Sequence, residues 1–187
     1  VATTTADITA RPLTITAVAD TKEYIRTTAS AGVPTLTSGA IQGSDSVTWT
    51  QTFDNWNVGS GKTLTPAGVV TDGNSGNNYS YTYTPVATGV ITAKAITGNF
   101  TVDATRVYDG GASANVLTRT LNNVISGDTV TLTGGTASYN NKNVGTGKTV
   151  TLSGASLADT DAGNYTLSSV ATTTADITAR PLTITAV

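Results

Sequence analysis

Two glycine-rich stretches of the chain end in Gly-Lys-Thr, the sequence that closes a phosphate-binding loop. They span residues 58–63 and 144–149 and contain the pairs Gly61-Lys62 and Gly147-Lys148. A phosphate-binding loop also needs a glycine five positions before the glycine of the Gly-Lys pair, and a helix after it. Trp56 and Lys142 occupy those earlier positions, and β-prone residues follow. We therefore predict hairpin turns here and no nucleotide site.

Asp159 and Asp161 are the candidate metal ligands, because calcium loops place carboxylates at alternate positions. The full calcium pattern also needs a third oxygen ligand, a glycine and a distal glutamate at fixed offsets. Here Gly163 comes early, no glutamate follows, and the equivalent loop at residues 72–77 has a single acid. The favoured interpretation is an Asx-rich turn, with no metal and no other cofactor.

Tyr79, Tyr81 and Tyr83 share one face of a predicted strand, since successive side chains alternate between faces. This face could stack on the sugar rings of a glycan or on a neighbouring chain, or it could pack across strands. We favour cross-strand packing, and a core role at strand ends for Tyr24 and Tyr108. An intramolecular Lys–Asn amide is a further alternative, with amines supplied by Lys22, Lys62, Lys94, Lys142 and Lys148.

The composition excludes several function classes. There is no His, Cys or Met, so disulfides, thiolate metal sites and the commonest general base are absent. A net charge of −2 with 12% charged residues gives no basic surface for nucleic acid. No apolar run reaches the roughly 18 residues of a membrane span. The carboxylates show no pairing for acid–base hydrolysis, and we expect that the protein is not an enzyme.

The chain contains one 18-residue stretch twice. Residues 1–18 and residues 170–187 are identical, and residues 86–102 are a divergent third version. Fixed-period similarity of this kind indicates tandem modules. We expect the natural chain to continue on both sides.

The apolar residues of this stretch change parity in its middle, so the buried face changes sides there. The change falls at Arg11-Pro12, Lys94-Ala95 and Arg180-Pro181. Proline suits such a junction, because it donates no hydrogen bond to a strand ladder. We predict that the last strand of each module runs almost directly into the first strand of the next, which couples the modules stiffly.

These junctions divide the chain into four segments. Residues 1–11 would be the closing strand of a preceding repeat, residues 12–94 and 95–180 two modules, and residues 181–187 the first strand of a following repeat. Thr, Val, Ile and Tyr are plentiful, and Gly/Asn/Asp turns separate short β-prone runs. The predicted fold is all-β, with two tandem small β-sandwich modules of immunoglobulin-like or β-grasp-like layout.

The order of short motifs resembles the YDG repeat family, which is related to the MBG repeats. The second module carries Tyr108-Asp109-Gly110, then Ser-Gly-Asp-Thr-Val, Val-Gly-Thr-Gly-Lys-Thr-Val, Gly-Asn-Tyr-Thr-Leu and Ile-Thr-Ala-Arg. The first module departs from the motif with Tyr24-Ile25-Arg26. The resemblance covers essentially the whole chain. It implies tandem domains of large secreted bacterial adhesins and filamentous-haemagglutinin-like exoproteins, at the cell surface or outside the cell, without catalysis.

On this basis we expect a structural repeat segment of a long extracellular adhesin or biofilm-matrix fibre, acting as a stiff stalk. Its partners would be the neighbouring identical repeats of the same chain. The alternatives are lateral self-association into fibres, or a host- or biofilm-glycan-binding module that uses the face formed by Tyr79, Tyr81 and Tyr83.

Overall fold

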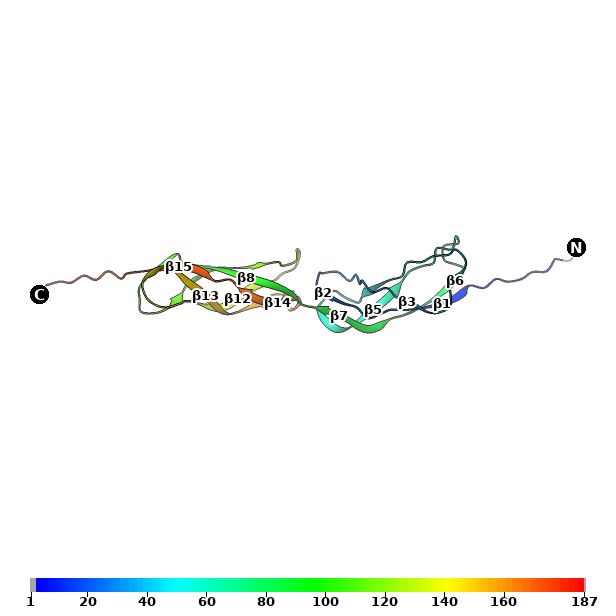
Figure 1. Cartoon of the computed structure of the whole chain (residues 1–187), viewed down its shortest axis with the longest axis horizontal. Coiled ribbons are helices and arrows are strands. Elements are labelled where there is room, and N and C mark those ends of the chain that lie inside the picture. The colour runs from blue at the N-terminus through cyan, green and yellow to red at the C-terminus, as the bar shows by residue number, and fades with distance from the viewer. Residues whose placement is uncertain (1–2, 187) are drawn as a thin grey trace. The chain divides into compact units, whose positions relative to one another are not determined.

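The computed structural model describes residues 3–186 and is almost entirely β-structure (Figure 1). The chain divides into two compact units, Val1–Thr92 and Ala93–Val187. The expected all-β fold with two tandem modules is confirmed. Among the described residues the only helix is the three-residue 3₁₀ turn η1 (Ala162–Asn164), and none is long and apolar enough to cross a lipid bilayer. Facing sheets without an α-helix agree with a sandwich and not with a β-grasp layout.

Over residues 3–92, unit 1 forms seven strands in two sheets. The strands are β1 (Arg11–Thr16), β2 (Thr21–Glu23), β3 (Thr35–Ser38), β4 (Thr50–Phe53), β5 (Gly59–Ala67), β6 (Tyr79–Thr84) and β7 (Val86–Thr92). One sheet has the order β3-β1-β6 and the other has the order β2-β7-β5-β4.

Unit 2 repeats this plan with one additional short strand, and four of its strands are longer than their counterparts in unit 1. The strands are β8 (Lys94–Val102), β9 (Thr105–Val107), β10 (Ser113–Ala114), β11 (Val116–Asn122), β12 (Thr131–Tyr139), β13 (Gly145–Ala158), β14 (Tyr165–Val170) and β15 (Thr173–Thr178). The sheet orders are β11-β8-β14 and β10-β12-β13-β15-β9.

In both units the segment that opens the unit runs parallel to the segment that closes it. In unit 1, β1 pairs with β6 in one sheet and β2 pairs with β7 in the other. In unit 2, β8 pairs with β14 and β9 pairs with β15 in the same way. The opening segment and the closing segment of each unit therefore both cross from one sheet to the other. The crossing of unit 1 is held by the buried Gln51, which accepts a hydrogen bond from the Val18 backbone N–H at 2.9 Å and donates to its carbonyl at 2.8 Å.

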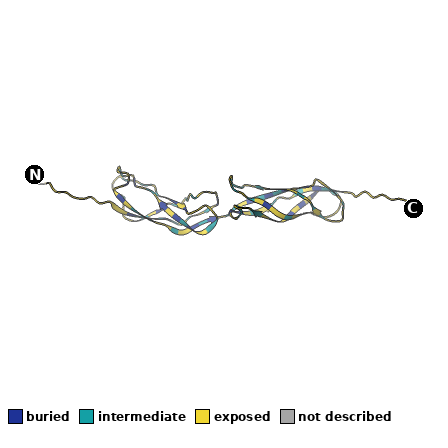
Figure 2. Ribbon diagram, turned by 180° about the vertical axis from the view of Figure 1, so that it is seen from behind, coloured by how far each residue is buried: buried dark blue, intermediate teal, exposed yellow. Residues whose placement is uncertain are grey.

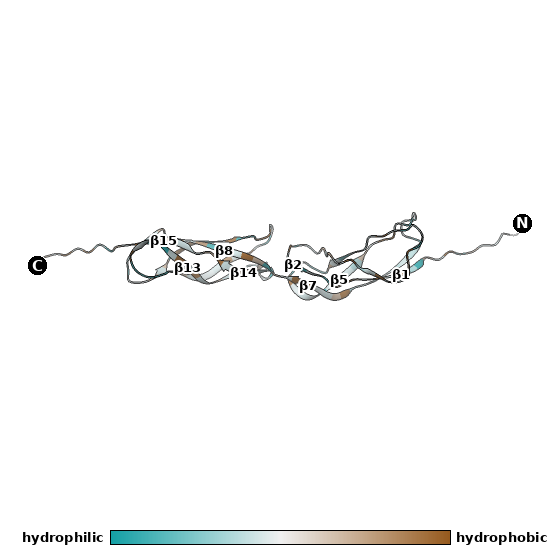
Figure 3. Ribbon diagram, viewed as in Figure 1, coloured by the Kyte–Doolittle hydropathy of each residue, from teal (hydrophilic) through white to brown (hydrophobic). Residues whose placement is uncertain are grey.

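The core of each unit lies between its sheets and follows the alternation of buried and exposed residues along the strands (Figures 2 and 3). One buried cluster of unit 1 consists of Leu13, Ile15, Val70 and Tyr79. One buried cluster of unit 2 consists of Phe100, Val102, Ala137, Tyr139, Val150, Leu152, Ala175 and Ile177. Burial of apolar surface in these clusters is the main source of stability for domains of this size.

The link between the units is a single residue, Ala93, because β7 ends at Thr92 and β8 begins at Lys94. The buried side of the chain changes here as the sequence predicts. Ile91 on β7 is 1% exposed, and Ile96 on β8, five positions later, is fully buried. The predicted junction at Lys94-Ala95 lies two residues from the division between the units.

The expected place of the two end segments in a preceding and a following repeat stays a prediction. Residues 3–10 and 179–186 form no strand and are exposed along their whole length, while residues 1–2 and 187 lie outside the described residues. A strand forms only where a neighbouring strand satisfies its backbone groups. Arg11 and Pro12 are the first two residues of β1, just as Lys94 and Ala95 are the first two of β8. Pro12 is tolerated there because the pairing of β1 with β3 begins only at Thr14.

Candidate functional site: the loop clamps of the repeat motifs

The Gly-Lys pairs of the repeat motif lie inside long strands, so the predicted hairpin turns are wrong. Gly61 and Gly147 have φ values of 67° and 58°, and the register of β5 and of β13 shifts next to them. These are β-bulges, in which glycine supplies the positive φ that a turn would also need. A Gly-x-Gly-Lys sequence fits both structures, which explains the error.

Each bulge directs its lysine to one loop of the same unit. Lys62 and Lys148 are 8% and 9% exposed, and each Nζ donates a 2.6 Å hydrogen bond to an asparagine Oδ1, that of Asn55 or of Asn141. The same oxygens accept the backbone N–H groups two residues later, at 3.0 Å in both units. The lysine thus fastens an Asx turn in front of its own strand. The structure describes this contact as a hydrogen bond, and the Lys–Asn amide stays a prediction.

Replacing Lys148 with methionine keeps the apolar stem and removes the clamp. We expect unit 2 to lose about 1.5–3 kcal/mol of unfolding free energy, as for other hydrogen bonds to charged groups. Urea unfolding followed by far-UV circular dichroism measures the loss. Lys142→Met is the matched control, because Lys142 is exposed in the same loop. Equal effects of the two substitutions would contradict the clamp.

A second clamp, which the sequence analysis missed, places a cation over an aromatic ring. Lys22 Nζ lies 4.8 Å from the centre of the Phe53 ring, and the Arg106 guanidinium lies 5.2 Å from that of Tyr139. Both cations also bind carbonyl groups of the loop that follows. Lys22 donates to Thr27 at 2.5 Å, and Arg106 donates to Gly111 at 2.6 Å. The sequence does contain a feature that indicates this clamp. Thr-Lys-Glu-Tyr at residues 21–24 aligns with Thr-Arg-Val-Tyr at residues 105–108, so a cation recurs at the same place in both modules.

The Tyr-Asp-Gly turn of unit 2 belongs to this clamp. Asp109 accepts from Arg106 at 3.0 Å and from the Gly111 N–H at 2.8 Å, and Gly110 has a φ of 88°. In unit 1 the position of Gly110 is occupied by Arg26, which adopts a φ of 59°. The backbone conformation of the turn is therefore kept without its glycine, at a conformational energy that Gly110 avoids.

A third clamp joins a buried tyrosine to the Gly/Asp turn of its unit. Tyr79 OH accepts the Gln42 N–H at 3.0 Å and donates to Asp45 at 2.7 Å. Tyr165 OH does the same with the Ile125 N–H at 3.0 Å and with Asp128 at 2.5 Å. Burial, then the hydrogen bond to Asp128, raises the pKa of Tyr165 to about 12. The hydrogen bond to Asp45 is the main cause that raises the pKa of Tyr79.

The three tyrosines on β6 face the core of unit 1. Tyr81 OH accepts the Val70 N–H at 3.0 Å and donates to the Gly76 carbonyl at 3.1 Å, and Tyr83 OH donates to the Gly68 carbonyl. The Tyr81 and Tyr83 rings stack with centroids 6.0 Å apart. The tyrosines share one face, as alternation predicts, but this face is engaged inside the unit. The packing favours cross-strand stabilisation over a platform for sugar rings.

Carboxylate oxygens hold both Asp-rich loops, but the Asx turn that the sequence predicts is described at Asp72, whose Oδ1 accepts the Asn74 N–H at 2.8 Å. At Asp161 the bond runs to a distant segment. Asp161 accepts the Thr129 N–H at 2.7 Å, and Asp159 has a φ of 78°. Within residues 3–186 no group of three or more acidic side chains could hold a metal ion. In the equivalent loop, burial alone would raise the pKa of Asp72. Hydrogen bonds from the Gly76, Asn74 and Asn78 N–H groups outweigh burial and lower this pKa.

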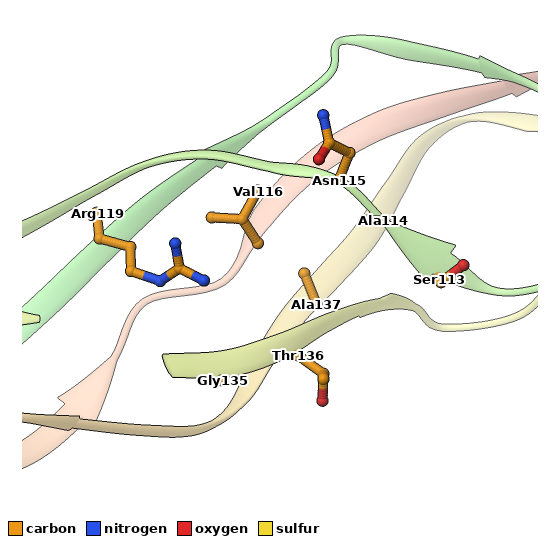
Figure 4. Close-up of a pocket in the computed structure, with 8 residues that line it drawn as sticks. All are labelled: Ser113, Ala114, Asn115, Val116, Arg119, Gly135, Thr136 and Ala137. Carbon is orange, nitrogen blue, oxygen red and sulfur yellow. The ribbon is translucent and has the colours of Figure 1, made fainter. Parts of the chain in front are cut away.

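A surface pocket of about 320 Å³ lies between β10, β11 and β12 of unit 2 (Figure 4). Its lining side chains do not converge. Asn115 and Thr136 point in opposite directions, and Val116 faces Ala137. Arg119 is engaged by the Gly134 carbonyl, to which its Nε donates at 2.9 Å. A ligand site needs several polar groups aimed at one point, and this pocket lacks them.

Comparison with protein-family models finds the YDG domain twice, over residues 9–87 and 92–175, which together make up most of the chain. Searches among curated proteins and among solved structures find no match.

Proposed function

The chain belongs to the YDG domain family, with two domains in tandem, and on this premise we propose that it is a structural repeat segment of a long extracellular bacterial adhesin or matrix fibre. In this proposal its units act as a stiff stalk that holds a distal region away from the cell, or that builds a filament. The proposal places the protein outside the cell or on its surface, and it assigns no catalytic step.

The connection between the units carries the proposal. A single residue, Ala93, separates β7 from β8, and the buried side of the chain changes between Ile91 and Ile96. Flexible linkers need several unpaired residues, usually rich in glycine and serine. A connection this short leaves few backbone angles free, and we infer that it restricts the motion of one unit against the next.

The loop clamps support the same function. In each unit, side chains from different strands fasten the loops through charged or buried hydrogen bonds. Such bonds keep loops from opening locally, which suits a module that transmits force or sets a spacing. The described pocket lacks convergent polar groups, so a spacing role fits the chemistry better than ligand capture.

Small-angle X-ray scattering tests the stiffness. We would compare the chain with a four-module version, made by repeating the 169-residue period, and with a variant that carries six Gly/Ser residues after Ala93. We expect the maximum dimension roughly to double with module number, and we expect the insertion to broaden the distribution of distances. A four-module chain hardly longer than the two-module chain, or an insertion without effect, would contradict the proposal.

A further inference from the structure

The identical 18-residue stretches adopt different structures at the two ends of the chain. Ile177 on β15 is 1% exposed, whereas its counterpart Ile8 is fully exposed. In the second half of the stretch the burial is reversed, because there the N-terminal copy is buried and the C-terminal copy is exposed. Leu13 and Ile15 on β1 are at most 1% exposed, while their counterparts Leu182 and Ile184 are 85% and 95% exposed. Each of these exposed apolar side chains therefore has a counterpart in the other copy of the stretch that is buried, and the structure describes what that counterpart packs against.

Residues 1–10 match the strand that closes unit 2 at every position. In that strand Ile177 lies opposite Gly145 of β13 and beside Arg106 of β9. Asp176 accepts the Gly147 N–H at 2.7 Å and donates its own N–H to the Ala104 carbonyl at 2.9 Å. Asp7 and Ile8 stand at the corresponding positions of the N-terminal segment and would make the same contacts in the same register.

We propose that residues 3–10 of one copy of this chain can replace β15 in unit 2 of a second copy. The two copies would then be joined head to tail without a covalent bond. The donor segment continues through Ala10 into β1 at Arg11, just as Thr92 continues through Ala93 into β8 at Lys94. The connection between the two copies would therefore be one residue long, like the connection between the two units within one chain. It is a form of strand addition between identical modules.

The resident β15 competes for the same position. As part of the same chain it acts at an effective concentration on the order of millimolar, so exchange in the unmodified chain at about 10 μM stays near or below ~1%. Weakening β15 without altering residues 1–10 should raise this population. The inference goes beyond the proposed function, because it concerns association between copies and does not require a stiff stalk.

Three variants of the full chain test the exchange. Ile177→Asp places a carboxylate in the buried position of β15 and leaves the donor segment intact. Ile8→Asp changes only the donor, at a fully exposed position. The double variant alters both segments. Sedimentation and light scattering between about 5 and 500 μM, a range that approaches the millimolar effective concentration from below, measure the mass of each variant.

We expect Ile177→Asp to form dimers and longer head-to-tail chains whose mass rises with concentration, while Ile8→Asp stays monomeric. The double variant should remain monomeric, with unit 2 destabilised. Addition of a synthetic peptide of residues 1–10 to the double variant should restore the far-UV circular dichroism of unit 2, and the same peptide with aspartate at position 8 should not. Equal masses for Ile177→Asp and the double variant, or no difference between the two peptides, would overturn the proposal.

Discussion

Replacing Ile91 with alanine is expected to lower the unfolding free energy of unit 1 by about 2–5 kcal/mol, and Ile96→Ala should do the same to unit 2. Both side chains are at most 1% exposed. Each substitution removes three methyl or methylene carbons from a packed core and leaves a cavity, which surrounding strands fill only in part. The pair lies on either side of Ala93, so each substitution probes the core of a different unit.

Both tryptophans, Trp49 and Trp56, belong to unit 1, which provides a reporter for that unit alone. Urea unfolding followed by tryptophan fluorescence should show the loss for Ile91→Ala. Far-UV circular dichroism, which sees both units, should show the loss for Ile96→Ala. Ala95→Ser, at an exposed position between the two, is the control and should change stability by less than about 0.5 kcal/mol. A tryptophan transition that Ile96→Ala moves as far as Ile91→Ala would contradict the assignment of the two cores.

The sequence predicts local features of the fold well, because they depend on residue type and period. Alternation of apolar residues predicts the burial of Leu13 and Ile15, and the parity change predicts that Ile91 and Ile96 lie on opposite sides of the chain. Turn residues predict the Asx turn at Asp72. None of these inferences requires knowledge of which strands are neighbours.

The features that could not be predicted depend on partners distant in sequence. Ile8 and Ile177 have identical neighbours along the chain, yet only Ile177 lies in a strand, because only β15 has β13 and β9 beside it. Local sequence therefore does not decide between strand and coil here. The parallel pairing of opening and closing segments is also a tertiary property, and no turn sequence encodes it.

The clamps were missed for the same reason, although the comparison of modules contained a signal. Tyr79 meets Asp45 across 34 positions of the sequence. Both residue types recur at the equivalent places in unit 2, as Tyr165 and Asp128. Recurrence of a polar pair in two modules that differ elsewhere indicates that the two residues act together, but only the fold shows that they touch.

Tyr165 fills the core of unit 2 and fastens a turn of the same unit. Tyr165→Ala should lower the unfolding free energy of unit 2 by roughly 3–5 kcal/mol, because it removes a side chain that is only 5% exposed. Tyr165→Phe keeps the ring and removes the hydroxyl that binds Ile125 and Asp128, so its effect should be about 1–3 kcal/mol. The difference between the two variants separates packing from the clamp.

The pH dependence of this difference gives an independent check. The pKa of Tyr165 is raised to about 12 in the folded protein, against about 10 for an unfolded tyrosine. The stability that its hydroxyl contributes is therefore fully present below pH ~10 and is lost as the pH rises toward 12. We expect the stability gap between the parent chain and Tyr165→Phe, measured by urea unfolding, to be constant from pH 7 to 9 and to shrink above pH ~10. A gap that persists unchanged up to pH ~12 would contradict the raised pKa of Tyr165 in the folded protein.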